Sequence, residues 1–315
     1  MTTPRVVCMG EALIDLLATD PDGRTWRAVP GGAPYNAAVA AGRLGAPTTF
    51  LGVLSDDQFG DMLRSHLAAS LVDHAHCPTT SEPTTVALVA HGADGDFTFH
   101  VAGTTTTSSR VNDLHLPSDV GILHVSGSVS MVIEPVASRF EGLLAAAQHR
   151  ALIHVDANPR PRIIARDRYL RRFNHWLGIA DVLKISTDDI EWMSPGADAV
   201  ETARHWVTPA DDDDDTHRPG VILLTRGAQG ATVIREDQVI DVPAPKVDVV
   251  DTVGAGDSFA GAVLAALAAH HIASRDALDR LDGHWWRTAA TYAAKAASIA
   301  CTRAGADPPR RGELT

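Results

Sequence analysis

Apolar positions along the chain fall into short runs rich in β-branched residues, and longer stretches with helical periodicity separate these runs. Alternation of strands with helices is typical of a mostly parallel sheet that helices cover on both faces. The pattern therefore predicts a doubly wound α/β fold. Its strands are expected at residues 6–10, 49–54, 122–126, 152–156, 182–186 and 221–225, and its helices at 35–44, 59–70, 134–150 and 258–301.

Two segments, residues 19–30 and 84–109, interrupt this alternation. The second holds two stretches of alternating apolar and polar residues around the Gly- and Asp-containing run at 91–96, which is a hairpin pattern. We expect both segments to form a small β-sheet that stands off the main body as a lid, so that residues 1–315 make a single domain. Two irregular surface loops are the alternative.

Composition and charge narrow the classes of partner. A chain with 45% hydrophobic and 21% charged residues is an ordinary globular protein. Its net charge of −12 repels nucleic-acid phosphates and anionic lipids, so we expect neither kind of partner. Cys8, Cys77 and Cys301 are too far apart for a CxxC site, and the first residues lack a secretory leader pattern, which together favour the cytoplasm. The five aspartates at 211–215 are expected to form a solvated loop tip.

The strongest chemical signal is the segment Asp-Thr-Val-Gly-Ala-Gly-Asp-Ser-Phe at 251–259. Gly254, Ala255 and Gly256 leave backbone N–H groups unobstructed just before a predicted helix, whose N-terminus adds the positive end of its dipole. The segment therefore predicts an anion hole for a phosphate group. Asp257 stands beside it in the first helical turn, where its carboxylate could take a proton from a hydroxyl that attacks phosphorus.

This segment has other interpretations. Asp257 could merely stabilise the start of the helix. A dinucleotide-binding G-x-G-x-x-G pattern fits poorly, because its third glycine position holds Phe259 and no acidic strand end follows at about 20 residues. The sequence has no Gly-Lys dipeptide, which excludes a Walker A loop.

A second signal lies near the N-terminus. Asp15 is expected just beyond the carboxyl end of the first strand, where open α/β sheets bind ligands. The pair Gly31 and Gly32 lets the backbone approach a ligand closely before Asn36 enters a helix. We expect Asp15 and Asn36 to converge on one pocket and to bind vicinal hydroxyls. In the alternative interpretation Asn36 is a helix cap and the glycines form a plain turn.

Polar residues also follow the later strands. Asn158 and Arg160 come directly after the strand at 152–156, and an arginine there could hold an anionic group bidentately. The next two strands are followed by further candidates, namely Ser186, Asp189, Thr225, Gly227 and Gly230.

Taken together, the segments GGAPYNAAVAAGRLG and DTVGAGDSFAGAVLAAL resemble the two signatures of the ribokinase-type (PfkB) carbohydrate kinases, and within them the bacterial fructokinases. The resemblance implies a ribokinase-like fold with a β lid, and transfer of the ATP γ-phosphoryl group to a sugar hydroxyl. It makes Asp257 the catalytic base and Gly254, Ala255 and Gly256 the anion hole. It further implies sugar binding by Asp15, Gly31, Gly32, Asn36, Asn158 and Arg160, ATP binding by Ser186, Thr225, Gly227 and Gly230, and a monovalent-cation site, for potassium, at Asp251 and Val253.

The chain departs from the family pattern at two places. The Asn-x-x-Glu element that such kinases use with Mg²⁺ stands here as Ser186-Thr187-Asp188-Asp189, which leaves Asp189 as an indirect Mg²⁺ partner. Fructokinases usually carry an aromatic-Tyr-Arg stretch in the lid, where this chain has Phe97-Thr98-Phe99-His100.

We therefore predict an ATP-dependent sugar kinase, with D-fructose phosphorylated to fructose 6-phosphate as the leading reaction. The alternatives are a 2-keto-3-deoxygluconate kinase or another sugar or nucleoside kinase of this type, a catalytically silent sugar or nucleotide sensor, and an NAD-dependent oxidoreductase. Because a small sheet with exposed edges invites pairing with a copy of itself, we also predict a homodimer that forms through the lid.

Overall fold

A nine-stranded sheet forms the body of the protein, with the strand order β15-β14-β13-β12-β11-β10-β1-β4-β6. In this computed structural model, residues 2–90, 97–208 and 216–314 are described. Every neighbouring pair from β13 to β6 is parallel, whereas β14 and β15 add an antiparallel edge. The strands are β1 (Arg5–Met9), β4 (Thr48–Leu51), β6 (Val72–Asp73), β10 (Val120–Ser126), β11 (Leu152–Asp156), β12 (Val182–Ser186), β13 (Val221–Thr225), β14 (Ala231–Ile234) and β15 (Val239–Val242).

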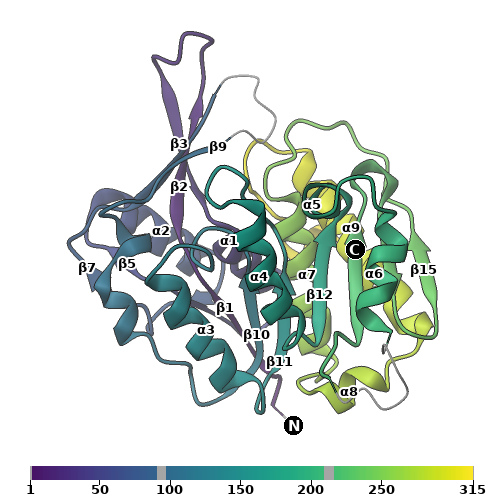
Figure 1. Cartoon of the computed structure of the whole chain (residues 1–315). Helices are drawn as coiled ribbons and strands as arrows, with labels where there is room; N and C mark the ends of the chain where they lie inside the picture. Colours follow the sequence, from purple (N-terminus) through teal and green to yellow (C-terminus); the bar gives the residue numbers. More distant parts are fainter. Residues whose placement is uncertain (1, 91–96, 209–215, 315) are drawn as a thin grey trace.

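Helices lie between these strands in the chain, so the predicted doubly wound α/β class is confirmed. Figure 1 shows α3 and α4 in front of the central strands, with α1, α7 and α9 behind or beside them. The helices are α1 (Ala33–Arg43), α2 (Gln58–Ala69), α3 (Val136–Ala147), α4 (Arg166–Leu177), α5 (Thr187–Met193), α6 (Ala199–Val207), α7 (Ala255–Ala269), α8 (Arg275–Asp279) and α9 (Gly283–Cys301). Within these described ranges no helix has the length and apolar character needed to span a membrane.

Two of the predicted stretches each contain more than one element. The strand expected at 49–54 is divided into β4 and the short β5 (Leu54–Ser55), which pairs with β7 (Thr79–Thr80). Gly52 lies at the break, where the backbone passes so close to the Gly10 carbonyl that a side chain would collide with it. The helical set expected at 258–301 consists of α7, α8 and α9, because the chain turns at His271, whose φ of 59° is left-handed, and again before Asp282, which caps α9.

The lid is a four-stranded sheet in the order β3-β2-β8-β9, which rises from the body at the top of Figure 1. Its strands are β2 (Leu13–Ala18), β3 (Trp26–Gly31), β8 (Thr85–Val89) and β9 (Phe97–His100). The prediction missed β2 and was wrong about the end of the second segment, where 3₁₀ turns occupy Thr105–Thr107 and Ser109–Asp113. The predicted turn at 91–96 and the aspartate run at 211–215 lie outside the described residues.

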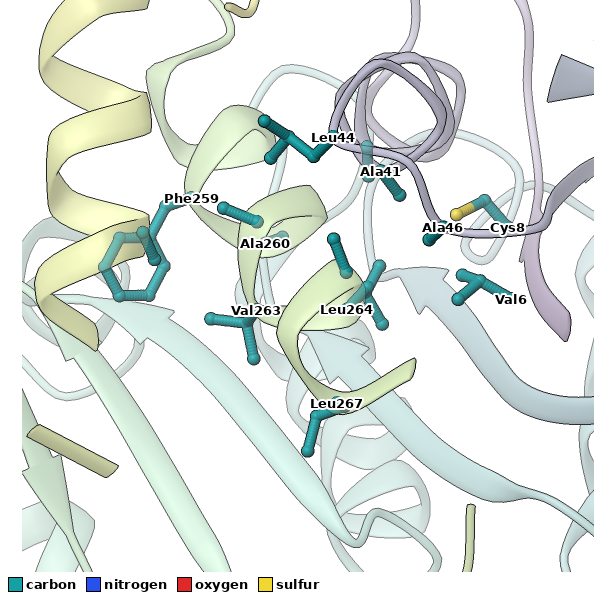
Figure 2. Packing of buried hydrophobic residues seen from close by; sticks show 14 of the residues in the cluster. Val6, Cys8, Ala41, Leu44, Ala46, Phe259, Ala260, Val263, Leu264 and Leu267 are labelled. Carbon is teal, nitrogen blue, oxygen red and sulfur yellow. The ribbon is translucent and has the colours of Figure 1, made fainter. Parts of the chain in front are cut away.

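The helix after the Gly-Ala-Gly segment is buried in the core. Helix α7 packs between α1 and α9, and nearly all of its residues from Ser258 onward are buried. Figure 2 shows Phe259, Ala260, Val263, Leu264 and Leu267 pointing in several directions from α7 into this core. A side chain at Gly261 would overlap Ala40 of α1, so the two helices are in direct backbone contact. This packing fixes the N-terminus of α7 at the carboxyl ends of the parallel strands.

Candidate active site

A cavity of about 220 Å³ lies between the lid and the carboxyl ends of the central strands. Main-chain and side-chain atoms from β2, α1, β9, β12 and the start of α7 line it. Open α/β sheets bind their ligands at this edge. The polar and charged side chains around the cavity are Glu11, Asp15, Asn36, Asn158, Arg160, Lys184, Thr252 and Asp257.

The segment predicted to form an anion hole lies at the N-terminus of α7. Gly254 is the N-cap of α7 with φ 74°, a left-handed conformation that favours glycine, and Ala255 and Gly256 open the helix. The Ala255 N–H donates to the Thr252 carbonyl at 3.2 Å, while Gly254 and Gly256 line the cavity at the positive end of the helix dipole. The site therefore suits a phosphoryl group.

Asp257 is buried in the first turn of α7, and its Oδ2 accepts a hydrogen bond of 2.8 Å from Asn36 Nδ2. No side-chain hydrogen bond caps this helix start, so Asp257 is not its cap; as the acidic residue of the first turn it is also placed to interact favourably with the helix dipole. Burial raises the pKa of Asp257, while the Asn36 hydrogen bond and the positive charge of Lys184 oppose that rise. A buried carboxylate with a raised pKa is suited to general-base chemistry.

Asp15 lines the same cavity, but its local structure differs from the prediction. It stands within lid strand β2 and not in a loop after β1, because the chain enters the lid only three residues beyond Gly10. Burial raises the pKa of Asp15 to about 7, and the positive charge of Arg160 works against this shift. Gly31 pairs with the same strand so closely that a side chain there would overlap the Asp15 carboxylate.

Asn36 is not a helix cap. Gly32 occupies the N-cap position of α1, and Asn36 lies one turn inside the helix with its side chain directed to Asp257. The predicted convergence of Asp15 and Asn36 on one pocket is confirmed, since both line the cavity.

Asn158 and Arg160 reach the same cavity from the segment after β11. Asn158 has a left-handed φ of 40°, and its Nδ2 donates to Ser126 Oγ at 3.1 Å. The positive charge of Arg160 opposes the rise in the pKa of both Asp15 and Asp257, so the guanidinium interacts electrostatically with both carboxylates.

The predicted nucleotide residues lie at the neighbouring strand ends, outside the lining of this cavity. Ser186 and Asp189 form a capping box at the start of α5: Ser186 Oγ accepts from the Asp189 N–H at 3.0 Å, and Asp189 Oδ2 accepts from the Ser186 N–H at 2.8 Å. Thr225 ends β13, and Gly227 and Gly230 bound the 3₁₀ turn that follows it. Their roles remain predictions.

Asp251 ties two loops together beside the anion hole. Its Oδ1 accepts from the Val253 N–H at 3.0 Å, and its Oδ2 accepts from the Gly305 N–H at 2.7 Å. A carboxylate oxygen is a ligand type that suits a hard cation. The predicted cation site thus has fitting chemistry, and its occupancy stays a prediction.

Sequence reasoning missed two residues of the cavity. Glu11 is buried and accepts hydrogen bonds of 2.5 Å from the hydroxyls of Ser128 and Ser130. Lys184 lies within the apolar strand β12, and its Nζ contacts both carboxylate oxygens of Asp156 at 3.0 and 2.9 Å. The signal for Lys184 was a lone lysine inside a run of aliphatic residues, since such a charge is buried only with a partner.

An anion hole at a buried helix, a carboxylate beside it and polar side chains at the strand ends define an α/β phosphotransferase site. The sequence profile of the pfkB family carbohydrate kinases matches residues 3–311. The chain belongs to this family of ATP-binding kinases, which leaves the oxidoreductase alternative without support.

Named relatives agree with this assignment. The chain is 33% identical over 282 residues to a fructokinase of Rhizobium leguminosarum bv. trifolii, which covers 88% of this chain and 84% of that protein. The structure of a Xylella fastidiosa fructokinase with bound ATP matches with a TM-score of 0.86 and 28% identity, over 99% of this chain and 97% of that one. A Salmonella enterica aminoimidazole riboside kinase, solved with its riboside and an ATP analogue, matches with a TM-score of 0.81 and 26% identity, over 98% of each chain.

Proposed function

We propose that this carbohydrate kinase transfers the γ-phosphoryl group of ATP to the 6-hydroxyl of D-fructose. The observation that carries the proposal is the contact between Asn36 and Asp257 beside the N-terminus of α7, with Asp15 on the same cavity. The similarity to fructokinases supports fructose as the acceptor. With ATP as the donor, we infer that the protein acts in the cytoplasm.

Each residue has a separate task in this reaction. Asp15 and Asn36 bind sugar hydroxyls and orient the acceptor, while Gly31 and Gly32 let it approach the main chain. Asp257 takes the proton of the attacking hydroxyl as its oxygen bonds to the γ-phosphorus and the bond to the β-phosphate oxygen breaks, releasing ADP. The N–H groups at Gly254, Ala255 and Gly256 bind the transferred phosphoryl oxygens.

ATP binding would involve Ser186, Thr225, Gly227 and Gly230 along the neighbouring strand ends. Mg²⁺, when bound with ATP, neutralises phosphate charge. Asp189 would reach it indirectly, because one of its carboxylate oxygens is engaged by the Ser186 N–H. Asp251 and the main chain of Val253 would hold a potassium ion.

A 2-keto-3-deoxygluconate kinase is the second candidate. Arg160 lines the sugar cavity, and a guanidinium there could pair with the substrate carboxylate that fructose lacks. The lid contributes the stacked pair Phe97 and Phe99, with ring centroids 5.8 Å apart, where fructokinases usually place a tyrosine and an arginine.

A panel of sugars separates these candidates. We expect ADP release with ATP to be fastest with D-fructose, compared with ketodeoxygluconate, ribose and nucleosides. A higher kcat/KM for ketodeoxygluconate would make that sugar acid the substrate. Tight sugar binding in calorimetry without turnover on any acceptor would favour the silent sensor and contradict the proposed function.

We also propose a homodimer that forms through the lid. The edge strands β3 and β9 leave one side unpaired within the described sheet, and Trp26 on β3 is 38% exposed. Light scattering at micromolar concentration is expected to give twice the mass of one chain. The Trp26→Arg variant is expected to give a mass closer to that of the monomer. The control Leu71→Arg changes an exposed apolar residue on the body and leaves the mass unaltered. A wild-type monomer would contradict the dimer.

A further inference from the structure

Lys184 is a buried lysine on the large sheet that the proposed mechanism has not used. It lies near the carboxyl end of β12, with valine, leucine and isoleucine as its strand neighbours. Its side chain is 6% exposed and that of its partner Asp156 is 1% exposed. Removing one member of such a buried ion pair is strongly destabilising, but replacing both members by well-packed apolar residues of the same shape often leaves the protein as stable. Stability alone is therefore a weak reason for the presence of the Lys184–Asp156 pair.

The ammonium of Lys184 lies against the start of α7. A Cβ built on Gly256 would be only 2.9 Å from Lys184 Nζ, so glycine at this position makes room for the ammonium. Lys184, Gly254, Gly256 and Asp257 line the same cavity. A positive side chain and the positive end of a helix dipole therefore face the same cavity, and together they favour binding of an anion there.

The ammonium keeps capacity for such an anion. It carries three N–H donors and no acceptor. Its two side-chain contacts in the structure are the two Asp156 oxygens, at 3.0 and 2.9 Å. Burial lowers the pKa of Lys184, but the carboxylates of Asp156, Asp189 and Asp257 more than offset this, and the pKa is raised. Lys184 therefore stays protonated and does not compete with Asp257 for the hydroxyl proton.

We propose that Lys184 is a further catalytic residue, which donates a hydrogen bond to an oxygen of the phosphoryl group during its transfer. This inference rests on the proposed kinase reaction. Lys184 forms no covalent bond and loses no proton, since the proton of the sugar hydroxyl goes to Asp257. Asp156 holds the ammonium in place beneath Gly256 and acts as a positioning residue.

The test replaces the ammonium with an apolar side chain of similar length. We expect Lys184→Met to lower kcat by about 10²–10³-fold, the effect of removing one donor to a transition-state oxyanion. The KM for the sugar is expected to stay nearly unchanged, because Lys184 acts on the phosphoryl group. The matched control is Lys246→Met. Lys246 is an exposed lysine in the segment before the anion hole, and we expect its replacement to leave kcat and KM at their wild-type values.

A binding measurement gives a readout that does not depend on turnover. Calorimetry would compare ADP alone with ADP plus aluminium fluoride, which imitates the transferring phosphoryl group. Wild-type protein is expected to bind the fluoride complex more tightly than ADP, and Lys184→Met to lose most of that difference while its affinity for ADP stays within a few fold.

Folding is controlled with a second variant. Lys184→Met could leave Asp156 as an unpaired buried charge, which a lower melting temperature would show. In that case the double variant Asp156→Asn with Lys184→Met removes both charges. We expect this double variant to fold and to keep the low kcat of Lys184→Met. Wild-type kcat, or retained selectivity for the fluoride complex, in a folded Lys184 variant would overturn the role of Lys184. A wild-type enzyme that phosphorylates no sugar would instead overturn the proposed function, and the fluoride titration would still test Lys184.

Discussion

Replacing Asp257 with asparagine is expected to lower kcat by on the order of 10²-fold or more, the usual contribution of a general base being about 10²–10⁴-fold. Asparagine keeps the size of the side chain but cannot accept the hydroxyl proton. The KM values for ATP and sugar should change little, because the lost interaction belongs to the transition state. Steady-state kinetics on purified variant and wild-type protein would measure both quantities.

A matched variant separates catalysis from helix capping. Asp282 caps α9, where its Oδ1 accepts from the Trp285 N–H at 2.8 Å, far along the chain from the cavity residues. Asp282→Asn should leave stability nearly unchanged, because asparagine caps a helix as well as aspartate, whereas Asp282→Ala should lower the free energy of unfolding by about 0.5–2 kcal/mol. Both variants should leave the turnover of folded protein unchanged. If Asp257→Asn behaved like these variants, with near-normal kcat and only a lower melting temperature, Asp257 would have no part in the chemistry.

Acid should slow the wild-type enzyme for the same reason. Burial raises the pKa of Asp257, so its proton-accepting form is lost at a higher pH than for an ordinary aspartate. We expect kcat/KM to fall as the pH drops below neutrality, where Asp15, with a pKa of about 7, also becomes protonated. A flat profile between pH 5 and 8 would contradict this assignment.

Sequence reasoning predicted best where a residue's role depends on its place at a strand or helix end. The Gly-Ala-Gly turn and Asp257 could be placed in this way, because the buried helix after them has an unmistakable apolar pattern. Asn36 was expected near the same pocket, but its bond to Asp257 joins residues 221 positions apart and depends on the packing of α1 against α7.

The residues that were missed depend on pairing across the sheet. Lys184 is placed beside Asp156 by the parallel register of β11 and β12, which a single sequence does not reveal. Strand β2 was hidden for another reason. It is a six-residue run that follows β1 after only a short turn, and of its partner strands β3 is near in the chain whereas β8 begins only at Thr85. The lid sheet therefore forms only when distant segments meet.

Replacing Asp15 with asparagine should weaken sugar binding and at the same time stabilise the free protein at alkaline pH. Asp15 is 5% exposed, and its folded-state pKa of about 7 lies above the ordinary value of 3.8. The folded state thus binds a proton more tightly than the unfolded state, so the stabilising contribution of Asp15 is fully present below pH 3.8 and is lost as the pH rises through 7. At pH 8 the buried charge is a net cost of folding, which sugar hydroxyls offset only in the complex.

Asparagine carries no charge at any pH, so the melting temperature of Asp15→Asn should exceed that of the wild type at pH 8, and the difference should shrink toward pH 4. Its KM for sugar should rise by about 10–100-fold, since a hydrogen bond to a charged group contributes about 1.5–3 kcal/mol. Thermal scans across this pH range and sugar titrations would measure both effects. Asp61→Asn is the control, because Asp61 is exposed on α2 and should leave both quantities unchanged. A melting difference that is constant across the pH range would show that Asp15 is not the buried titrating group, and an unchanged KM would remove it from the sugar site.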